Sequence, residues 1–255
     1  MSKSDGEYIL EAEDVVKRFG GLVAVNHVNL KVRRESVTML MGPNGAGKTT
    51  FVNVCTGVLK PDGGRIYFMG EDITGLPSHK IYAKGFVRTF QVPQPFSSLT
   101  VLENVLVAMK TKGEGPIRGA LKGFWVKEEE ENVEKALRIL AKVGLDEYWD
   151  REAYTLGGAQ LKMLEVARGL AAGAKLIALD EPIGGVDPVY ADEILSYVRG
   201  LKKDGLSFLL IEHRIDIALP YADYVYVMDR GKVISEGTPD QVANDRKVIE
   251  VYVGE

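Results

Sequence analysis

Residues 42–49 read GPNGAGKT, a complete GxxxxGK[ST] pattern. It follows a short apolar run, VTMLM at 37–41, and precedes FVNVCTGVL at 51–59, whose spacing is typical of a helix packed on a sheet. Glycines allow successive backbone N–H groups to point into one concavity that holds phosphate, and the lysine adds positive charge. The stretch therefore predicts a strand, a phosphate-binding loop and a helix, and the chain is organised around this unit.

The positions of this loop have separate chemical roles. Lys48 is expected to contact the β- and γ-phosphates of a nucleotide, and the hydroxyl of Thr49 is expected to bind Mg²⁺. The pattern occurs once, and no repeat of 20 to 50 residues is present, which excludes a tandem duplication. The nucleotide-binding residues predicted here are Gly42, Pro43, Asn44, Gly45, Ala46, Gly47, Lys48, Thr49 and Thr50.

Two further apolar runs end in polar side chains. LIALDEP at 176–182 places Asp180 and Glu181 at the carboxyl end of a predicted strand, where ligands of open α/β sheets bind. Asp180 is expected to hold the Mg²⁺ shell, and Glu181 to polarise the attacking water. LSFLLI at 206–211 ends in Glu212 and His213, and an imidazole at that edge could contact a γ-phosphate or orient water. Taken alone, a histidine at a strand end is more often structural.

The rest of the chain divides by pattern. Residues 8–32 alternate around the turn signal FGG, and residues 60–75 read as a turn, a strand and another turn, so an antiparallel layer is predicted. Between about residues 96 and 170 there is no convincing strand, and three helical patterns lie around Leu102 to Met109, Lys127 to Val143 and Gln160 to Leu170. After residue 170, predicted strands alternate with a helical stretch at 188–204, as in a parallel α/β sheet. We predict one domain over 1–255, with a core at about 1–95 and 171–255 and a helical subdomain at about 96–170.

Composition narrows the function. Lys+Arg 32 against Asp+Glu 36 gives a net charge of −4, which argues against a dedicated nucleic-acid binder. The longest apolar stretches, such as SFLLI at 207–211, are far too short to cross a bilayer. The N-terminal stretch lacks the apolar core of a signal peptide, and the single Cys55 cannot form an intrachain disulfide. We therefore expect a cytosolic protein. Any role at a membrane would depend on a partner protein.

The order of these elements resembles the nucleotide-binding domain of an ABC transporter over essentially the whole chain. In that family a signature, LSGGQ, opens a helix shortly before the acidic strand. Here the position reads LGGAQ at 156–160, and the family's separation of 20 residues from the signature glutamine to the Walker B aspartate is kept, since Gln160 is followed by Asp180. The signature residues implied by the resemblance are Leu156, Gly157, Gly158, Ala159 and Gln160.

The resemblance also implies roles for residues that would be uninformative alone. Gln91 in RTFQVPQPF matches the Q-loop glutamine, with catalytic and Mg²⁺-binding roles. Asp187 in GGVDP matches the D-loop, and His213 the switch histidine. Phe19 in VVKRFGG matches the aromatic residue that stacks on adenine, and Val25 is included in the same nucleotide site.

The signature departs from the family pattern in a way that bears on chemistry. The family's serine donates its hydroxyl to the γ-phosphate of ATP bound to the opposite subunit, and Gly157 has no hydroxyl. Ala159 places a methyl group where a second glycine is usual. The N–H groups at the helix start remain as donors. The hypothesis is that the ATP-bound dimer closes less tightly, by about 1 to 2 kcal/mol per lost bond to a charged group.

The resemblance implies a mechanism and its partners. Each ATP lies between residues 42–50 of one subunit and 156–160 of a second ATP-binding subunit, head to tail. ATP closes the pair, and hydrolysis lets it open and moves transmembrane permease subunits. An extracytoplasmic solute-binding protein takes part only indirectly. The chain is then a peripheral protein on the cytoplasmic face of the cell membrane.

The cargo rests on resemblance alone. Residues 75–105 and 245–255 are similar to the ATP-binding subunits of branched-chain amino-acid importers (Leu, Ile, Val), with import of urea or of other amino acids as the rival. From another class, an ABC-type ATPase of iron-sulfur cluster assembly also lacks membrane spans. Chromosome-maintenance ATPases would need a long heptad insertion that is absent here. A small-molecule kinase would not need a signature helix. A module that binds ATP without hydrolysing it would not need Glu181 and His213.

Overall fold

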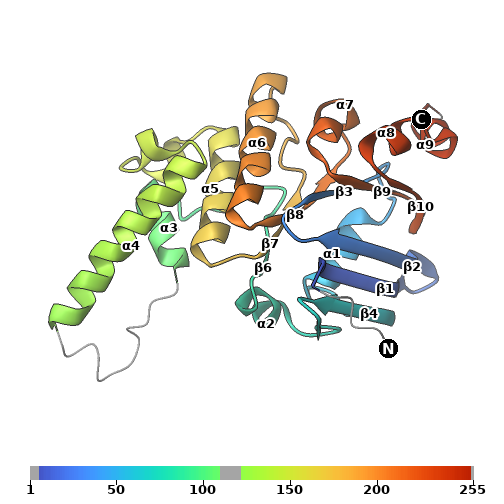
Figure 1. Cartoon of the computed structure of the whole chain (residues 1–255), viewed down its shortest axis with the longest axis horizontal. Coiled ribbons are helices and arrows are strands. Elements are labelled where there is room, and N and C mark those ends of the chain that lie inside the picture. The colour runs from blue at the N-terminus through green and yellow to red at the C-terminus, as the bar shows by residue number, and fades with distance from the viewer. Residues whose placement is uncertain (1–5, 110–121, 254–255) are drawn as a thin grey trace. The chain divides into compact units, whose positions relative to one another are not determined.

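The computed structural model describes residues 6–109 and 122–253 (Figure 1). Contacts divide the chain into two compact units, one formed by Met1–Gln91 with Lys175–Glu255 and the other by Val92–Ala174. Residues 1–5, part of the N-terminal stretch considered above, lie outside the described residues. No helix within the described ranges is long and apolar enough to span a membrane.

The first unit contains a four-stranded antiparallel sheet. Its strand order is β2-β1-β4-β5. The strands are β1 (Tyr8–Phe19), β2 (Leu22–Arg33), β4 (Gly63–Phe68) and β5 (Glu71–Asp72). Phe19 pairs with Leu22 across the two-glycine turn, and Gly20 takes φ +56° there, a conformation that suits a tight hairpin. The predicted antiparallel layer is confirmed.

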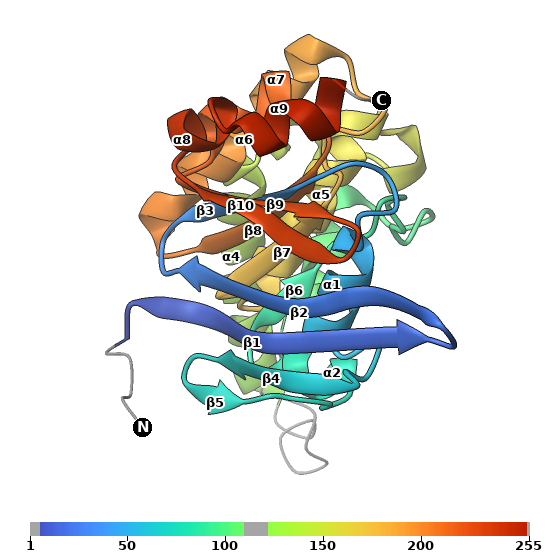
Figure 2. The ribbon, with the colours of Figure 1, turned by 90° about the vertical axis from the view of Figure 1, so that its right-hand side faces the viewer.

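A six-stranded sheet lies above this layer in Figure 2, with order β10-β9-β3-β8-β7-β6. The strands are β3 (Val37–Met41), β6 (Phe86–Arg88), β7 (Leu176–Asp180), β8 (Ser207–Glu212), β9 (Tyr224–Asp229) and β10 (Lys232–Gly237). All pairs are parallel except β9 with β10. Every residue of β3, β7 and β8 is buried, which explains why these strands read as continuous apolar runs. The mostly parallel core is confirmed.

Different elements cover the two faces of the six-stranded sheet. Helices α6 to α9 lie on one side, and the antiparallel layer lies on the other (Figure 2). Phe51, Val52 and Cys55 of α1 share one core cluster with strands of both sheets, and burial raises the pKa of the Cys55 thiol, as suits a core residue. The helices are α1 (Lys48–Cys55), α2 (Ser78–Ala83), α6 (Pro188–Leu201), η3 (Lys202–Asp204), α7 (Ile215–Ala218), η4 (Leu219–Tyr221), α8 (Pro239–Ala243) and α9 (Arg246–Val253).

The second unit is helical. Its elements are α3 (Val101–Ala108), α4 (Lys122–Lys142), η1 (Asp146–Tyr148), η2 (Ala153–Thr155) and α5 (Gly158–Ala171). Thr100 and Glu103 form a reciprocal capping box that starts α3, and the buried Asn104 side chain bonds to the backbone of residues 96, 99 and 100. The three predicted helices are confirmed. Within the described part of this unit the only β pairing is a single bridge between Thr100 and Glu152.

The sequence did not predict β6 and β10. β6 has only three residues, which is below the length at which alternation is visible, and β10 reads KVISEG with mixed burial. Both strands are edges of the sheet, where one side of the strand is unpaired and a continuous apolar run is not required.

Candidate active site

The phosphate-binding loop has a backbone that only glycine can adopt at two positions. Gly42 has φ +146°, and a Cβ there would lie 2.1 Å from the carbonyl oxygen of Met228. Gly47 has φ +99°, and its Cβ would lie 2.3 Å from the oxygen of Ala24. The loop therefore packs closely against the backbone of β9 at Gly42 and of β2 at Gly47. The packing of this loop therefore requires glycine at both positions.

Lys48 and Thr49 open α1. Lys48 is 6% exposed, and its ammonium group donates to the carbonyl oxygens of Gly42 and Pro43, the second at 2.9 Å, so the side chain lies back over its own loop. Thr49 is exposed in the first turn. The free N–H groups and the dipole of the helix add to the lysine charge, and together they favour a phosphate at this end.

Asp180 ends β7 and makes a buried ion pair that the sequence did not predict. Arg88 Nη2 donates to Asp180 Oδ2 at 2.6 Å, with the two side chains 11% and 6% exposed. Arg88 Nη1 also donates to the Asn53 side chain on α1. The arginine thus joins β6, β7 and the helix that follows the phosphate loop. In the sequence, Arg88 is only a charged residue three positions before Gln91. Its pairing with Asp180 cannot be inferred until β6 is known.

Gln91, Glu181 and His213 come together around the carboxylate of Glu181. Gln91 Nε2 donates to Glu181 Oε2 at 2.7 Å, and His213 Nδ1 lies 3.6 Å from Glu181 Oε1. Glu181 has φ +50°, a left-handed backbone that is rare in residues other than glycine. Such strain is often found at catalytic positions. The three residues predicted to be catalytic therefore form one cluster.

Glu212 lies directly before His213 and is fully buried. Burial raises the pKa of its carboxyl group, while the backbone N–H groups of Ile183 and His213 act in the opposite direction by donating to it. In the sequence, this residue marks only the end of a predicted strand. A glutamate inside an apolar strand could have indicated a carboxylate held by backbone donors.

Three other predicted residues occupy different environments. Asp187 caps α6 by accepting from the Val189 N–H at 3.0 Å and is exposed. Phe19 is 47% exposed at the end of β1, with the Lys17 ammonium 5.5 Å from the ring centroid. Val25 is fully buried in the core cluster, which is a supporting position rather than a contact surface.

The predicted signature lies in the helical unit, at the start of α5. Gly157 is the N-cap with φ −72° and ψ 166°, and its N–H donates to Gln160 Oε1 at 2.8 Å. Gly158 and Ala159 form the first turn, and Leu156 is buried. The residues therefore present backbone donors at a helix N-terminus.

The site can support phosphoryl transfer to water with a divalent cation. Thr49, Gln91 and Asp180 supply hydroxyl, amide and carboxylate oxygens, the hard donors that Mg²⁺ prefers. Because Gln91 turns its amide nitrogen to Glu181, its amide oxygen is the atom available for a cation. The residues present thus fit Mg²⁺ together with nucleotide oxygens.

Comparison with known proteins gives consistent matches along the chain. The model of a family described as ABC transporter matches residues 25–184, and one described as branched-chain amino acid ATP-binding cassette transporter matches 232–255. A probable branched-chain amino acid transport ATP-binding protein, LivG of Archaeoglobus fulgidus, is 51% identical over 96% of this chain and 95% of its own length. BraF of Pseudomonas aeruginosa, a high-affinity branched-chain amino acid transport ATP-binding protein, is 40% identical over 97% and 98%.

A solved structure agrees with these matches. The ADP conformation of an ATP-binding cassette from an ABC transporter is 45% identical and superposes with a TM-score of 0.85. It covers 97% of this chain and 99% of its own. The similarity therefore extends through both units.

Proposed function

The chain belongs to the ABC transporter family, and on that premise we propose that it is the ATP-hydrolysing subunit of an importer for branched-chain amino acids. The resemblance inferred from the sequence is confirmed by these matches. The match at residues 232–255 and the names of the full-length relatives support this cargo over urea.

The cluster around Glu181 is the observation that carries the catalytic part of the proposal. Glu181 accepts a proton from water, whose oxygen forms a bond to the γ-phosphorus while the bond to the bridging oxygen of ADP breaks. Gln91 and His213 contact the two carboxylate oxygens and fix their direction. The positive charge of Lys48 and the loop N–H groups stabilise the charge on the transferred phosphoryl group.

A divalent cation completes the site in this proposal. When bound, Mg²⁺ would neutralise charge on the phosphate oxygens, and Thr49, Asp180 and Gln91 would hold it. Arg88 keeps one oxygen of Asp180 engaged at 2.6 Å and so fixes the orientation of that carboxylate. Phe19 offers its exposed ring face to the adenine.

Two chains share each ATP in the proposed assembly. The start of α5, at residues 156–160, contributes its backbone donors to a nucleotide held by the phosphate loop of a second ATP-binding subunit. Closure and opening of the pair move transmembrane permease subunits, which receive the amino acid from an extracytoplasmic binding protein. The chain then works at the cytoplasmic face of the membrane.

The proposal is tested by co-purification. A tagged Glu181→Gln variant, which retains ATP, is extracted from native membranes with Mg-ATP, and the chains that accompany it are identified. Very hydrophobic permease subunits together with an amino-acid-binding protein are expected, and these partners should be depleted without nucleotide. A urea-binding protein in the complex would show that the cargo is urea and not a branched-chain amino acid. Recovery of only non-membrane partners, as for an assembly ATPase, would overturn the importer proposal.

A further inference from the structure

We infer that Glu212 and Arg214, the chain neighbours of His213, are positioning residues that fix the loop of residues 181–186 and thereby the carboxylate of Glu181. This inference rests on the proposed role of Glu181 as general base. It adds two residues to the machinery that the sequence analysis and the comparisons do not assign to it.

Three hydrogen bonds join the 181–186 loop to the end of β8 and the residues that follow it. Together they cover both ends and the middle of the loop. They are Glu181 N–H to Ile211 O at 2.9 Å, Ile183 N–H to Glu212 Oε1 at 3.0 Å, and Arg214 Nη1 to Val186 O at 2.9 Å. Two of the three depend on a side chain, and so they can be removed by substitution.

The backbone at Glu181 explains why such bonds are needed. Its φ of +50° is disfavoured for a residue with a Cβ, so neighbouring contacts must hold it in place. Inside the loop, Gly184 N–H donates to Glu181 O at 3.0 Å, and Val186 N–H to Ile183 O at 3.2 Å. These two bonds close local turns inside the loop. We therefore expect that anchoring it at Ile183 and Val186 restrains Glu181 as well.

Glu212 connects the loop to the switch histidine. Its second oxygen, Oε2, accepts from the His213 N–H at 3.2 Å, so one buried carboxyl group bonds both to the 181–186 loop and to the backbone that carries the imidazole. His213 Nδ1 lies 3.6 Å from Glu181 Oε1. We expect the two attachments of Glu212 to hold this pair of side chains together.

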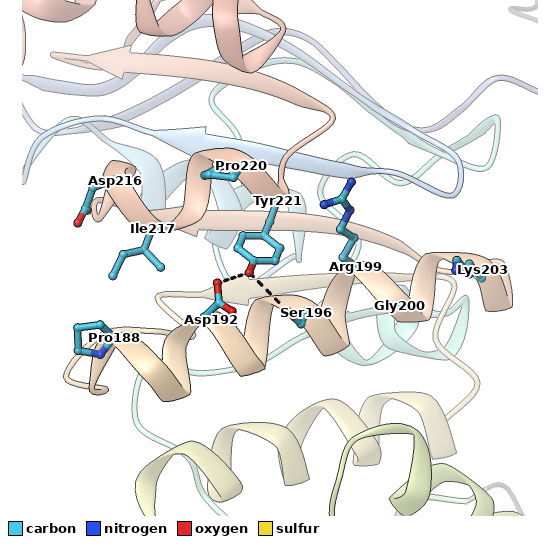
Figure 3. Close-up of a pocket in the computed structure, with 10 residues that line it drawn as sticks. All are labelled: Pro188, Asp192, Ser196, Arg199, Gly200, Lys203, Asp216, Ile217, Pro220 and Tyr221. Carbon is cyan, nitrogen blue, oxygen red and sulfur yellow. Dashed lines mark hydrogen bonds between the residues drawn. The ribbon is translucent and has the colours of Figure 1, made fainter.

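The helices that continue these two segments are separated by a groove of about 660 Å³, lined by α6 and η3 on one side and by α7 and η4 on the other. Figure 3 shows Tyr221 reaching across it, with hydrogen bonds to Asp192 and Ser196. The hydrogen bonds of Glu212 and Arg214 are two of the contacts that connect the segments leading into these helices.

The first test is Glu212→Gln in the purified full chain. Glutamine keeps the size of the side chain, but its NH₂ group cannot accept from a backbone N–H, so at least one of the backbone bonds to this side chain is lost in either orientation. We expect kcat for ATP hydrolysis to fall at least about tenfold, with KM for ATP changed less than about twofold because the phosphate loop is untouched. Glu193→Gln, an exposed position on α6, is the matched control and should leave both constants unchanged.

The second test uses Arg214, which is only partly buried, so its variants should fold. Arg214→Met removes the donor to Val186, whereas Arg214→Lys keeps a cation that can reach the same carbonyl. We expect the methionine variant to lower kcat about tenfold and the lysine variant to restore most of it. Combined with Glu181→Gln, neither Glu212→Gln nor Arg214→Met should slow turnover further, because their effect passes through Glu181.

The outcomes separate the two levels of inference. If Glu181→Gln is slow while Glu212→Gln and Arg214→Met turn over like the unmodified chain, the positioning role is wrong. It is also wrong if these variants slow Glu181→Gln further by their full single-variant factor. If Glu181→Gln itself turns over normally, the proposed role of Glu181 as general base fails instead.

Discussion

The two parts of the chain assigned to ATP differ in how strongly the fold dictates their residues. At the carboxyl edge of the parallel sheet, Gly42 and Gly47 have positive φ and no room for a Cβ, and Glu181 has a left-handed backbone. At the start of α5, Gly157 has φ −72°, and a Cβ there would meet only Gln160 Oε1 at 3.5 Å. In the first region the backbone dictates the residue types. In the second region the backbone tolerates other residues, so function can decide which residue stands there.

An ion pair at the sheet edge and one on α4 of the helical unit differ in burial in a similar way. Arg88 and Asp180 are 11% and 6% exposed and pair at 2.6 Å, whereas Arg138 and Glu134 on α4 are 64% and 70% exposed and lie 3.5 Å apart. Buried pairs are costly to break because the remaining charge has no partner, and exposed pairs contribute little. Variants of equal chemistry in the two regions should therefore have unequal effects.

The largest effect is expected for Arg88→Met. It leaves the Asp180 carboxylate without its guanidinium and the Asn53 side chain without its donor, so the free energy of unfolding should fall by about 3 to 5 kcal/mol. Arg138→Met is the control in the helical unit and should change it by less than about 0.5 kcal/mol. Urea unfolding followed by circular dichroism measures both. Similar losses in the two variants would remove the distinction between the regions.

Next in size is the effect of Glu181→Gln on turnover. The amide cannot accept a proton from water, so hydrolysis should slow at least about a hundredfold, while Mg-ATP still binds through the phosphate loop. Fluorescent ATP binding and phosphate release separate these two steps. Turnover near that of the unmodified chain would remove Glu181 from the role of base.

The substitution of Gly47 by alanine should have a smaller effect, on stability. A φ of +99° and an Ala24 oxygen 2.3 Å from the new Cβ force the loop to shift, at a cost of about 1 to 3 kcal/mol in unfolding free energy. Gly158→Ala in the signature is the matched control, since nothing lies within 4 Å of its Cβ and alanine favours helix. Thermal unfolding of both variants decides between them, and equal destabilisation would contradict the comparison.

The sequence predicted the elements whose causes are local. The glycine pattern and the apolar runs of β3, β7 and β8 each act over a few positions, and all were found. Asp180, Glu181 and His213 could be placed at one sheet edge because parallel strands end together.

Long-range contacts were not predictable in the same way. Arg88 meets Asp180 across 92 positions, and Glu212 meets Ile183 across 29. Neither pair produces a periodic pattern, and β6 is too short to indicate that Arg88 reaches the sheet edge. The resemblance identified Gln91, which has no signal of its own in the sequence. It did not identify Arg88 and Glu212, which contact the predicted site residues or the loop that carries them.

The smallest expected effect belongs to Gly157→Ser, which tests whether the signature has lost a useful hydroxyl. The backbone of Gly157 is one that serine adopts readily, so the fold should be preserved. A hydroxyl bonded to the γ-phosphate of the opposite subunit's ATP should tighten ATP-driven dimerisation by about 1 to 2 kcal/mol, roughly tenfold. Sedimentation of the Glu181→Gln background with Mg-ATP measures the dimer constant.

Gly157→Ala separates the hydroxyl from the side effects of adding a Cβ. Alanine fills the same space beside Gln160 Oε1 but has no donor, so only serine should tighten the dimer. An equal gain in both variants would assign the effect to the order of the α5 N-terminus. No gain in either would mean that the backbone N–H groups of α5 already satisfy the phosphate, and the departure from the family signature would then carry no cost in assembly.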